Sequence, residues 1–166
     1  MRIGIYPGSF DPITLGHLDI ITRASGIVDQ LIIAVLKNNE KNPLFTADER
    51  VECIKRVISE KPELSQVKVE SFDGLLVDYA DRKGGSIIVR GLRAITDFEY
   101  ELQLAQMNHK LNSNIDTIFF TTSVTYSYLS SSAVKEIASF GGDISPFVPQ
   151  TIVQDVYDKY NSKRSV

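Results

Sequence analysis

Five short runs of apolar and β-branched residues are spaced along the chain, and most of them are apolar at consecutive positions rather than at alternating ones. Such runs are typical of strands whose two faces are both buried, as in a parallel sheet covered by helices. The predicted strands cover residues 3–6, 31–36, 67–69, 86–89 and 117–120.

The segments between these runs carry apolar residues at helical spacing. Leu18, Ile21 and Ala24 mark a first helix. Thr46 and Glu49 form a T-x-x-E capping box, which predicts the start of a second. The remaining helices are expected over residues 75–82, from an N-cap at Asp97 to residue 111, over residues 134–138 after a serine triplet, and from Pro149 onward.

Strand and helix alternate five times along the chain, which predicts right-handed βαβ crossovers. The expected fold class is α/β: a doubly wound, five-stranded parallel sheet, Rossmann-like, with helices on both faces. The 166 residues suit one compact domain, expected over residues 1–160, with residues 161–166 as a polar C-terminal tail that frays. Sheets of this kind bind ligands at the carboxyl ends of their strands, so motifs that follow strands are expected to meet there.

Composition and charge narrow the class of protein. Hydrophobic residues make up 43% and charged residues 23%, the balance of an ordinary globular protein. The net charge is −3 and the basic residues are scattered, which argues against nucleic acid as a partner. The single Cys53 cannot form an internal disulfide and the two histidines make no zinc-like cluster, so we expect a reducing, cytoplasmic setting. The first residues lack a signal-peptide layout and no apolar run is long enough to span a bilayer, so we expect no membrane partner.

The segment of residues 7–17, directly after the first predicted strand, has the composition of a phosphate-binding turn. Gly8 lets a backbone approach a phosphate closely, and His17 brings an imidazole to the first turn of a helix, where free N–H groups favour anions. The glycine spacing is neither G-x-G-x-x-G nor G-x-x-x-x-G-K-[ST], which excludes the dinucleotide fingerprint and the P-loop. A lone histidine at such a position is more often a local hydrogen-bonding residue, so the case for catalysis depends on its neighbours.

Two further polar segments follow later strands. Residues 90–93 place two arginines around a glycine, which suits forked hydrogen bonds to phosphate oxygens, although these arginines could instead pair with Asp97 or Glu101. Residues 126–132 offer hydroxyls and backbone donors at a helix start. Capping explains one serine of that segment, and three serines in a row favour phosphate contact.

These segments together resemble a known family of enzymes. Thr14, Gly16 and His17 match the fixed positions of the T/H-x-G-H signature of nucleotidyltransferases. With residues 90–93, the acidic block of residues 97–101, the serine triplet and Lys41 ahead of residues 43–46, the chain resembles the bacterial phosphopantetheine adenylyltransferases from residue 6 to at least residue 149.

The resemblance implies transfer of AMP from ATP to 4′-phosphopantetheine, giving dephospho-coenzyme A and pyrophosphate, the penultimate step of coenzyme A synthesis. The acceptor phosphate would attack the α-phosphorus in line, without a covalent enzyme intermediate, helped by positioning and by stabilisation of charge. The resemblance also implies Mg²⁺ carried on the phosphates of ATP, with no metal ligands assigned in the chain. It further implies a homo-oligomer, a hexamer built from two trimers, and feedback by coenzyme A as a theme of the family.

The residues expected to act are carried over position by position from this resemblance. The expected catalytic residues are His17, at the transition state, and Ser9, at the incoming phosphate. The residues expected on the phosphopantetheine side are Ser9, Lys41, Leu76 and Arg90. The residues expected on the ATP side are Ser9, Phe10, His17, Gly91, Leu92, Arg93, Glu101, Tyr126, Ser127, Tyr128, Leu129, Ser130, Ser131 and Ser132.

Two positions depart from the family pattern. Ser9 stands where many relatives have threonine, and because serine keeps the hydroxyl we expect the chemistry to be retained. Ser139 stands where several relatives have arginine, and we expect the missing cation to weaken the hold on the β- and γ-phosphates.

Alternative functions stay open on the sequence. A sister transferase that uses CTP, or that accepts nicotinamide mononucleotide or glycerol phosphate, shares the motif after the first strand. A regulatory module that binds nucleotide without turnover is the alternative from another class. A fragment of a tRNA synthetase is disfavoured by the short chain and the missing K-M-S-K-S-like loop.

Side chains outside these motifs are interpreted as structural. Cys53 is expected to be a buried, inert thiol, and Tyr100 and Met107 are expected to pack against the rest of the chain from the long fourth helix. Residues 102–111 of that helix are apolar around more than one side, which suggests a subunit contact.

Overall fold

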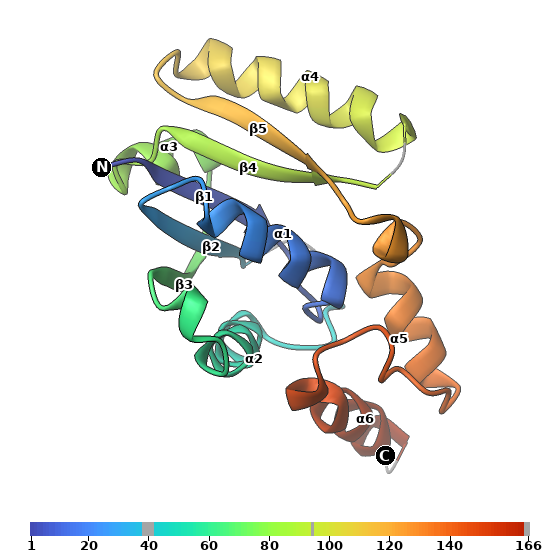
Figure 1. Cartoon of the computed structure of the whole chain (residues 1–166). Coiled ribbons are helices and arrows are strands. Elements are labelled where there is room, and N and C mark those ends of the chain that lie inside the picture. The colour runs from blue at the N-terminus through green and yellow to red at the C-terminus, as the bar shows by residue number, and fades with distance from the viewer. Residues whose placement is uncertain (38–41, 94, 165–166) are drawn as a thin grey trace.

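The computed structural model describes residues 1–37, 42–93 and 95–164, and its centre is a five-stranded parallel sheet (Figure 1). The strands are β1 Ile3–Gly8, β2 Gln30–Leu36, β3 Val67–Phe72, β4 Ile87–Leu92 and β5 Asp116–Thr121. Their order in the sheet is β3-β2-β1-β4-β5, with β1 at the centre. The predicted doubly wound sheet is therefore confirmed.

The helices lie where helical spacing was found. They are α1 Leu15–Ser25, α2 Ala47–Ser59, α3 Leu76–Arg82, α4 Ile95–Leu111, α5 Ser131–Ser139 and α6 Gln150–Arg164. Two single turns of 3₁₀-helix, η1 Pro62–Leu64 and η2 Val124–Tyr126, were not predicted, because three residues are too few to show a period. No helix in the described part of the chain is long and apolar enough to cross a bilayer.

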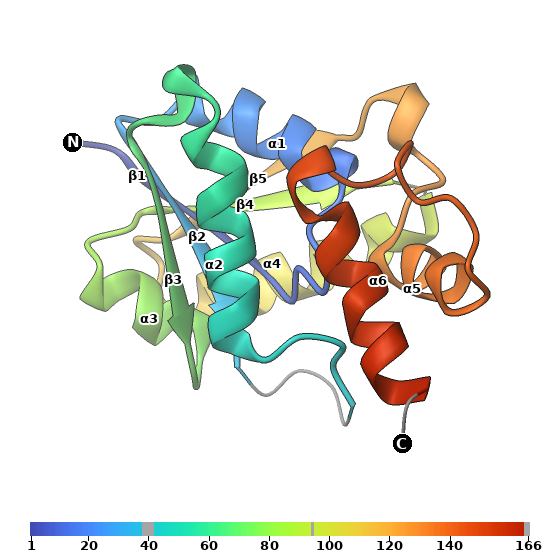
Figure 2. The ribbon, with the colours of Figure 1, turned by 90° about the horizontal axis from the view of Figure 1, so that it is seen from below.

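The two faces of the sheet bury different sets of side chains. On one face Ile33 of β2 packs with Ile21 of α1 and Ile54 of α2, and on the other Ile32 packs with Val77 of α3. Neighbouring residues of one strand thus enter opposite core layers, which explains why the strands are apolar at consecutive positions. Helix α6 lies beside α2 on the first face, whereas α4 lies along β4 and β5 (Figures 1 and 2).

Two predicted boundaries differ from the structure. Helix α4 begins at Ile95, so Asp97 is not its N-cap but a residue of its first turn. The Asp97 carboxylate still binds backbone at the helix start, since it accepts from the N–H of Arg93, two residues ahead of the helix, at 3.3 Å. Helix α6 continues to Arg164, past the point where the polar tail was expected, because polar residues do not break a helix.

Helix α4 leaves large apolar side chains in contact with solvent. Tyr100 and Met107 were expected to pack within the chain, but they are 62% and 55% exposed. Phe98, Leu102 and Leu111 are also exposed. The helix packs on β4, β5 and α3 with one side only, so apolar residues around more than one side exceed what a single chain can bury.

Candidate active site

The segments that follow β1, β4 and β5 meet at the carboxyl edge of the sheet and enclose a cavity of about 420 Å³. Because β1, β4 and β5 are neighbours in the sheet, segments far apart in sequence become adjacent there. The predicted site residues that line this cavity are Ser9, Phe10, His17, Arg90, Gly91, Arg93, Glu101, Tyr126, Leu129, Ser130, Ser131 and Ser132.

A few predicted site residues lie elsewhere. Leu92, Ser127 and Tyr128 are not part of the cavity wall. The Leu92 carbonyl accepts from the Thr122 N–H at 2.9 Å as the last rung between β4 and β5, and the Ser127 hydroxyl donates to the Val124 carbonyl at 3.0 Å. Leu76 lines a second cavity of about 360 Å³, and Lys41 lies outside the described residues.

The two cavities share a wall. Pro7, Gly8, Arg90, Tyr100 and Glu101 border both of them. A molecule in the second cavity and a molecule in the first can therefore meet across the Gly8 backbone and the Arg90 guanidinium. This is the geometry that joining two substrates requires.

The T-x-G-H motif forms the capped start of α1. Thr14 is the N-cap, and its hydroxyl accepts from the His17 N–H at 3.3 Å. In return the Thr14 N–H donates to Nδ1 of His17 at 3.1 Å, so histidine takes the place that glutamate has in an ordinary capping box. The spacing of the motif thus holds the imidazole at the positive end of a helix.

His17 is neutral in this setting, and its tautomer is fixed. Because Nδ1 accepts from a backbone N–H, the proton of the neutral ring is on Nε2, which is left to donate to a ligand. Burial is the largest cause that lowers the pKa of His17, and together with the positive charges of Arg93 and Arg90 it brings the pKa to about 4. The ring of Phe10 packs edge-on against His17, with the ring centroids 5.0 Å apart, and restricts its orientation.

Arg90 is held in a fixed orientation between the two cavities. Its Nε donates to one carboxylate oxygen of Glu101 at 2.7 Å, its Nη2 donates to the other, and its Nη1 donates to the Pro7 carbonyl at 3.1 Å. Burial alone lowers the pKa of Arg90, but the hydrogen bonds and the charge of Glu101 outweigh it and leave the pKa above its ordinary value. These bonds use three of the five guanidinium N–H groups, so two remain for phosphate oxygens.

The pairing of arginines with acidic residues, which was the alternative for residues 90–93, occurs at both arginines. Arg93 lies 3.4 Å from the Asp97 carboxylate and donates to the Leu129 carbonyl at 3.2 Å. That second bond links the segment after β4 to the segment after β5. Both arginines also line the cavity, so the ion pairs orient them there instead of removing them from it.

Within the described part of the chain, two of the three serine hydroxyls have hydrogen-bond partners. Ser130 is the N-cap of α5 and accepts from the Ala133 N–H at 3.1 Å, whereas Ser131 donates to the Pro12 carbonyl at 2.7 Å. Donation to a phosphate by the Ser131 hydroxyl would compete with its bond to the Pro12 carbonyl, whereas the Ser130 hydroxyl accepts in its cap bond and can still donate its hydrogen to a phosphate. The backbone N–H groups at the start of α5 remain suitable donors.

Gly91 is required by packing. A Cβ at this position would lie 2.1 Å from Cδ1 of Ile20 on α1, which is far below contact distance. The missing side chain therefore lets α1 lie close to the end of β4, and this places His17 and Arg90 around one cavity.

Some residues of the cavity wall were not predicted. Tyr6 lines the cavity and is 5% exposed, and burial raises its pKa. Asp97 and Tyr100 also line it. The sequence held a usable signal for Thr14, since a T-x-x-H spacing at a helix start is that of a capping box.

Among the described residues, no group of three or more His, Cys, Asp or Glu side chains is arranged to hold a metal ion. The two carboxylates of the cavity wall, Asp97 and Glu101, are each paired with an arginine.

Comparison with known proteins agrees with this arrangement. The family model described as cytidylyltransferase-like matches residues 5–137. The chain therefore belongs to the cytidylyltransferase-like family, and its fold and site are those of a nucleotidyltransferase.

Relatives of high sequence identity show which family of nucleotidyltransferases the chain belongs to. The chain is 65% identical over 165 residues to the phosphopantetheine adenylyltransferase of Lachnoclostridium phytofermentans, covering 99% of both chains. It is 54% identical over 159 residues to that of Alkaliphilus metalliredigens, covering 96% of this chain and 99% of the relative. Within the nucleotidyltransferases it belongs to the phosphopantetheine adenylyltransferase family, which confirms the resemblance found in the sequence.

Solved structures of more distant proteins share the fold. The nicotinic acid mononucleotide adenylyltransferase of Plasmodium falciparum complexed with NaAD aligns with a TM-score of 0.71 at 16% identity, and covers 96% of each chain. The same enzyme complexed with APC aligns with a TM-score of 0.69 at 17% identity, with the same coverage. At this identity the likeness concerns the fold alone.

Proposed function

We propose that this chain transfers AMP from ATP to 4′-phosphopantetheine and releases pyrophosphate and dephospho-coenzyme A. The observation that carries the proposal is the fixed, neutral imidazole of His17 at the start of α1, in a cavity that adjoins a second cavity. The names of relatives that match the chain from end to end supply the acceptor. A single transfer site between two substrate cavities accounts for the position of His17 and for the two substrates.

The proposed reaction is a direct displacement. A phosphate oxygen of the acceptor forms a bond to the α-phosphorus of ATP, and the bond from that phosphorus to the oxygen bridging to the β-phosphate breaks, so that pyrophosphate leaves. His17 donates from Nε2–H to a non-bridging α-phosphate oxygen, where negative charge builds up. Because the imidazole stays neutral, it stabilises this charge as a hydrogen-bond donor and transfers no proton.

The positive groups of the site neutralise phosphate charge. Ser9, on the loop after β1, holds the incoming phosphate, and the two remaining N–H groups of Arg90 bind it from the shared wall of the cavities. Arg93 and the N–H groups at the start of α5 bind the triphosphate of ATP. Mg²⁺ enters with ATP on its phosphate oxygens and supplies further neutralisation of charge.

The setting and assembly of the protein form part of the proposal. The exposed apolar side chains of α4 support a homo-oligomer, proposed as a hexamer of two trimers. The buried Cys53 thiol, whose pKa is raised by burial, supports a reducing, cytoplasmic setting. Inhibition by coenzyme A is checked by adding it to the assay below.

The experiment is to measure pyrophosphate release with ATP and Mg²⁺, comparing 4′-phosphopantetheine, nicotinamide mononucleotide and glycerol 3-phosphate. Release only with 4′-phosphopantetheine, lowered about 100- to 1,000-fold in a His17→Ala variant, is the expected result. Release with another acceptor would keep the chemistry and change the substrate. ATP binding without release in any of the three mixtures would favour a regulatory module instead.

A further inference from the structure

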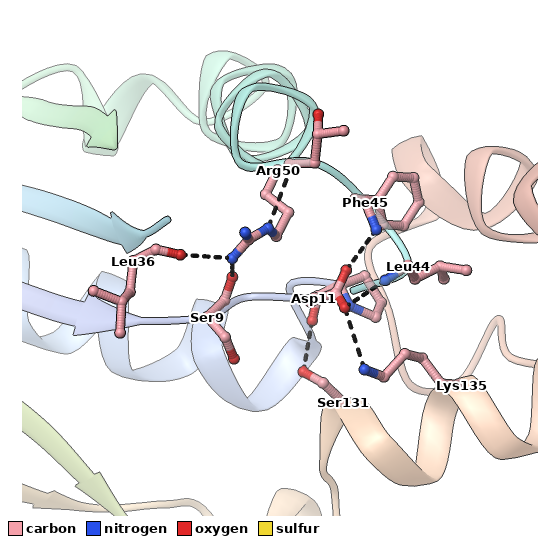
Figure 3. Close-up of polar contacts among 10 residues, drawn as sticks. Ser9, Asp11, Leu36, Leu44, Phe45, Arg50, Ser131 and Lys135 are labelled. Carbon is pink, nitrogen blue, oxygen red and sulfur yellow. Dashed lines mark hydrogen bonds and ion pairs between the residues drawn. The ribbon is translucent and has the colours of Figure 1, made fainter. Parts of the chain in front are cut away.

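The loop after β1 is held from the side away from the cavity by a buried arginine. Arg50, in the first turn of α2, is 3% exposed and does not line either cavity. Its Nη1 donates to the Ser9 carbonyl at 2.7 Å and to the Leu36 carbonyl at 3.1 Å, and its Nε donates to the Thr46 carbonyl at 3.3 Å (Figure 3). One guanidinium thus joins β1, β2 and α2 at the edge of the sheet.

These carbonyls belong to the positions where strand pairing ends. The last residues that β1 and β2 pair with each other are Gly8 and Val35, so Ser9 and Leu36 follow the end of this ladder, while Leu36 still pairs with Phe72 of β3 on its other side. Beyond the last rung of a parallel ladder, buried carbonyls need another donor. Arg50 donates to the Ser9 carbonyl and to the Leu36 carbonyl at once. It therefore fixes the distance between the ends of β1 and β2 at the point where the loop after β1 begins.

The position of Ser9 gives this contact a functional meaning. Ser9 lines the first cavity, and its hydroxyl points away from Arg50, on the opposite side of the backbone from its carbonyl (Figure 3). Binding of the carbonyl by Arg50 therefore fixes the direction of the hydroxyl and of the neighbouring N–H groups. A shift of about 1 Å in such a group can lower a rate about 100-fold.

The positive charge of Arg50 also favours binding of a phosphate at the loop after β1. Within the described residues Arg50 forms no ion pair, and its hydrogen-bond partners there are neutral carbonyl oxygens. A buried positive charge directly behind the loop favours an anion in front of it, because the low dielectric of the interior screens it weakly. Its planar fork also cannot be replaced by a lysine ammonium without losing contacts to separate carbonyls.

We propose that Arg50 is a positioning residue for the transfer reaction, acting through the Ser9 backbone on the phosphate that Ser9 holds. This inference rests on the proposed function for its substrates. It assigns to Arg50 no contact with either substrate.

A double-mutant cycle tests the inference. Arg50→Lys is expected to lower kcat/KM for the acceptor about 10-fold, and Arg50→Met about 100-fold, both measured per folded enzyme. In a Ser9→Ala background the same Arg50 changes are expected to cost at most about 3-fold, because the hydroxyl that they position is absent and only the neighbouring N–H groups are left to be displaced. Equal costs in both backgrounds would overturn the inference.

Arg56→Lys and Arg56→Met are the matched controls, since Arg56 lies on the same helix, is 48% exposed on its side chain and pairs with Asp155 of α6. They are expected to keep kcat/KM within about 2-fold of the unaltered protein. A purely structural role of Arg50 would lower the melting temperature of its variants and leave kcat/KM per folded enzyme unchanged, which contradicts the proposal. Arg50→Lys keeps the charge and serves where Arg50→Met does not fold.

Calorimetric titration with ATP alone separates this inference from the proposed function. Ser9 lines the first cavity and is expected to contact ATP as well as the acceptor, so Arg50→Lys is expected to weaken ATP binding several-fold relative to Arg56→Lys, whichever acceptor the enzyme uses. Absence of turnover in the unaltered protein would overturn the proposed function, whereas unchanged ATP affinity in Arg50→Lys would overturn the role of Arg50.

Discussion

The loop after β1 and the segment after β5 border the same cavity, but they are built in opposite ways. In the loop, Phe10, Asp11, Ile13 and Thr14 are each at most 2% exposed. In the segment of residues 122–130 most side chains reach solvent, and Val124 is 88% exposed. One side of the cavity is therefore part of the protein interior, and the other is part of its surface.

The hydrogen bonds of the two regions differ in the same sense. Asp11 accepts from the N–H groups of Leu44 and Phe45, each at 2.8 Å, and from Nζ of Lys135 at 3.2 Å (Figure 3). It thus ties the loop to two other parts of the chain. The segment after β5 is tied to other parts of the chain near its two ends, where the Leu92 carbonyl accepts from Thr122 and the Leu129 carbonyl accepts from Arg93. Between these ends the Ser127 hydroxyl bonds only three residues back, to the Val124 carbonyl at 3.0 Å. We expect the phosphate side of the site to be pre-formed and the segment after β5 to adapt to its ligand.

Backbone strain is found in the loop after β1. Phe10 has φ 48°, which is unusual for a residue other than glycine. Its ring lies edge-on between Tyr6 and His17, with centroid distances of 5.3 and 5.0 Å. Strain of this kind persists only where the surroundings over-determine the conformation, and these contacts do so.

The largest predicted effect is loss of the Asp11 carboxylate. Asp11→Ala leaves two buried N–H groups and the Lys135 ammonium without this acceptor, and we expect it to lower the free energy of unfolding by about 3–5 kcal/mol. Urea denaturation followed by circular dichroism measures the loss. Asp116→Asn is the control, because the Asp116 side chain is 84% exposed.

Asp11→Asn sharpens the same comparison. The amide keeps one acceptor oxygen and removes the charge, so we expect an intermediate loss of stability. A loss in Asp11→Ala no larger than that in Asp116→Asn would mean that the loop is held by its packing alone, and the contrast with the segment after β5 would fail.

The second effect is a dependence of stability on pH that comes from His17. Its pKa is about 4 in the folded chain and near 6.5 in the unfolded chain, so between these values the unfolded state binds more protons. The stabilisation is therefore complete above about pH 6.5 and is lost as the pH falls toward 4, by at most about 3 kcal/mol. Urea titrations from pH 7 to 4 measure it.

His17→Gln serves as the control for this pH dependence. The variant has no imidazole at position 17, so its stability should fall less steeply over the same range. Nuclear magnetic resonance of the His17 ring gives an independent reading, with midpoint expected near pH 4 in the folded protein. A midpoint near 6.5 would show that the loop does not exclude solvent from the ring.

Much of the fold could be predicted from the sequence, because its signals are local. Runs such as residues 31–36 are apolar at each position, and the capping box of Thr46 and Glu49 marks the start of α2 to the residue. The start of α4 was misplaced, since Asp97 binds backbone from the third position of the helix and not from its N-cap. Polar residues good at capping also serve inside the first turn, so composition does not separate the two.

The site was predicted less completely, for a different reason. The motif of residues 14–17 identifies His17, because motif and chemistry coincide in one short segment. Arg50 and Asp11 bind carbonyls and N–H groups 33 to 41 residues away in sequence, and such partners cannot be read from spacing. In the sequence Arg50 is one more arginine in an amphipathic helix.

The third effect concerns the start of α5, next to the segment after β5. Ser130→Ala removes the N-cap hydroxyl of α5, and we expect it to lower the free energy of unfolding by about 1 kcal/mol. Thr46→Ala removes the corresponding hydroxyl at α2, outside the cavity wall, and should cost about the same. Only Ser130→Ala is expected to raise the KM for ATP; an equal rise in both variants would contradict a role of Ser130 in binding.

The smallest effect concerns Ser139, the last residue of α5. It does not line the cavity, and its hydroxyl donates to the Glu136 carbonyl at 2.7 Å, so only a long side chain would reach toward the triphosphate from there. We expect Ser139→Arg to lower the KM for ATP about 3-fold, since an exposed charge pair contributes up to about 1 kcal/mol. Ser139→Gln, which is long but uncharged, should leave the KM unchanged, and the gain in Ser139→Arg should shrink as salt is added, because screening weakens an exposed pair. If the KM does not fall, the end of α5 lies too far from the cavity to contact ATP. The missing arginine then has no bearing on the β- and γ-phosphates.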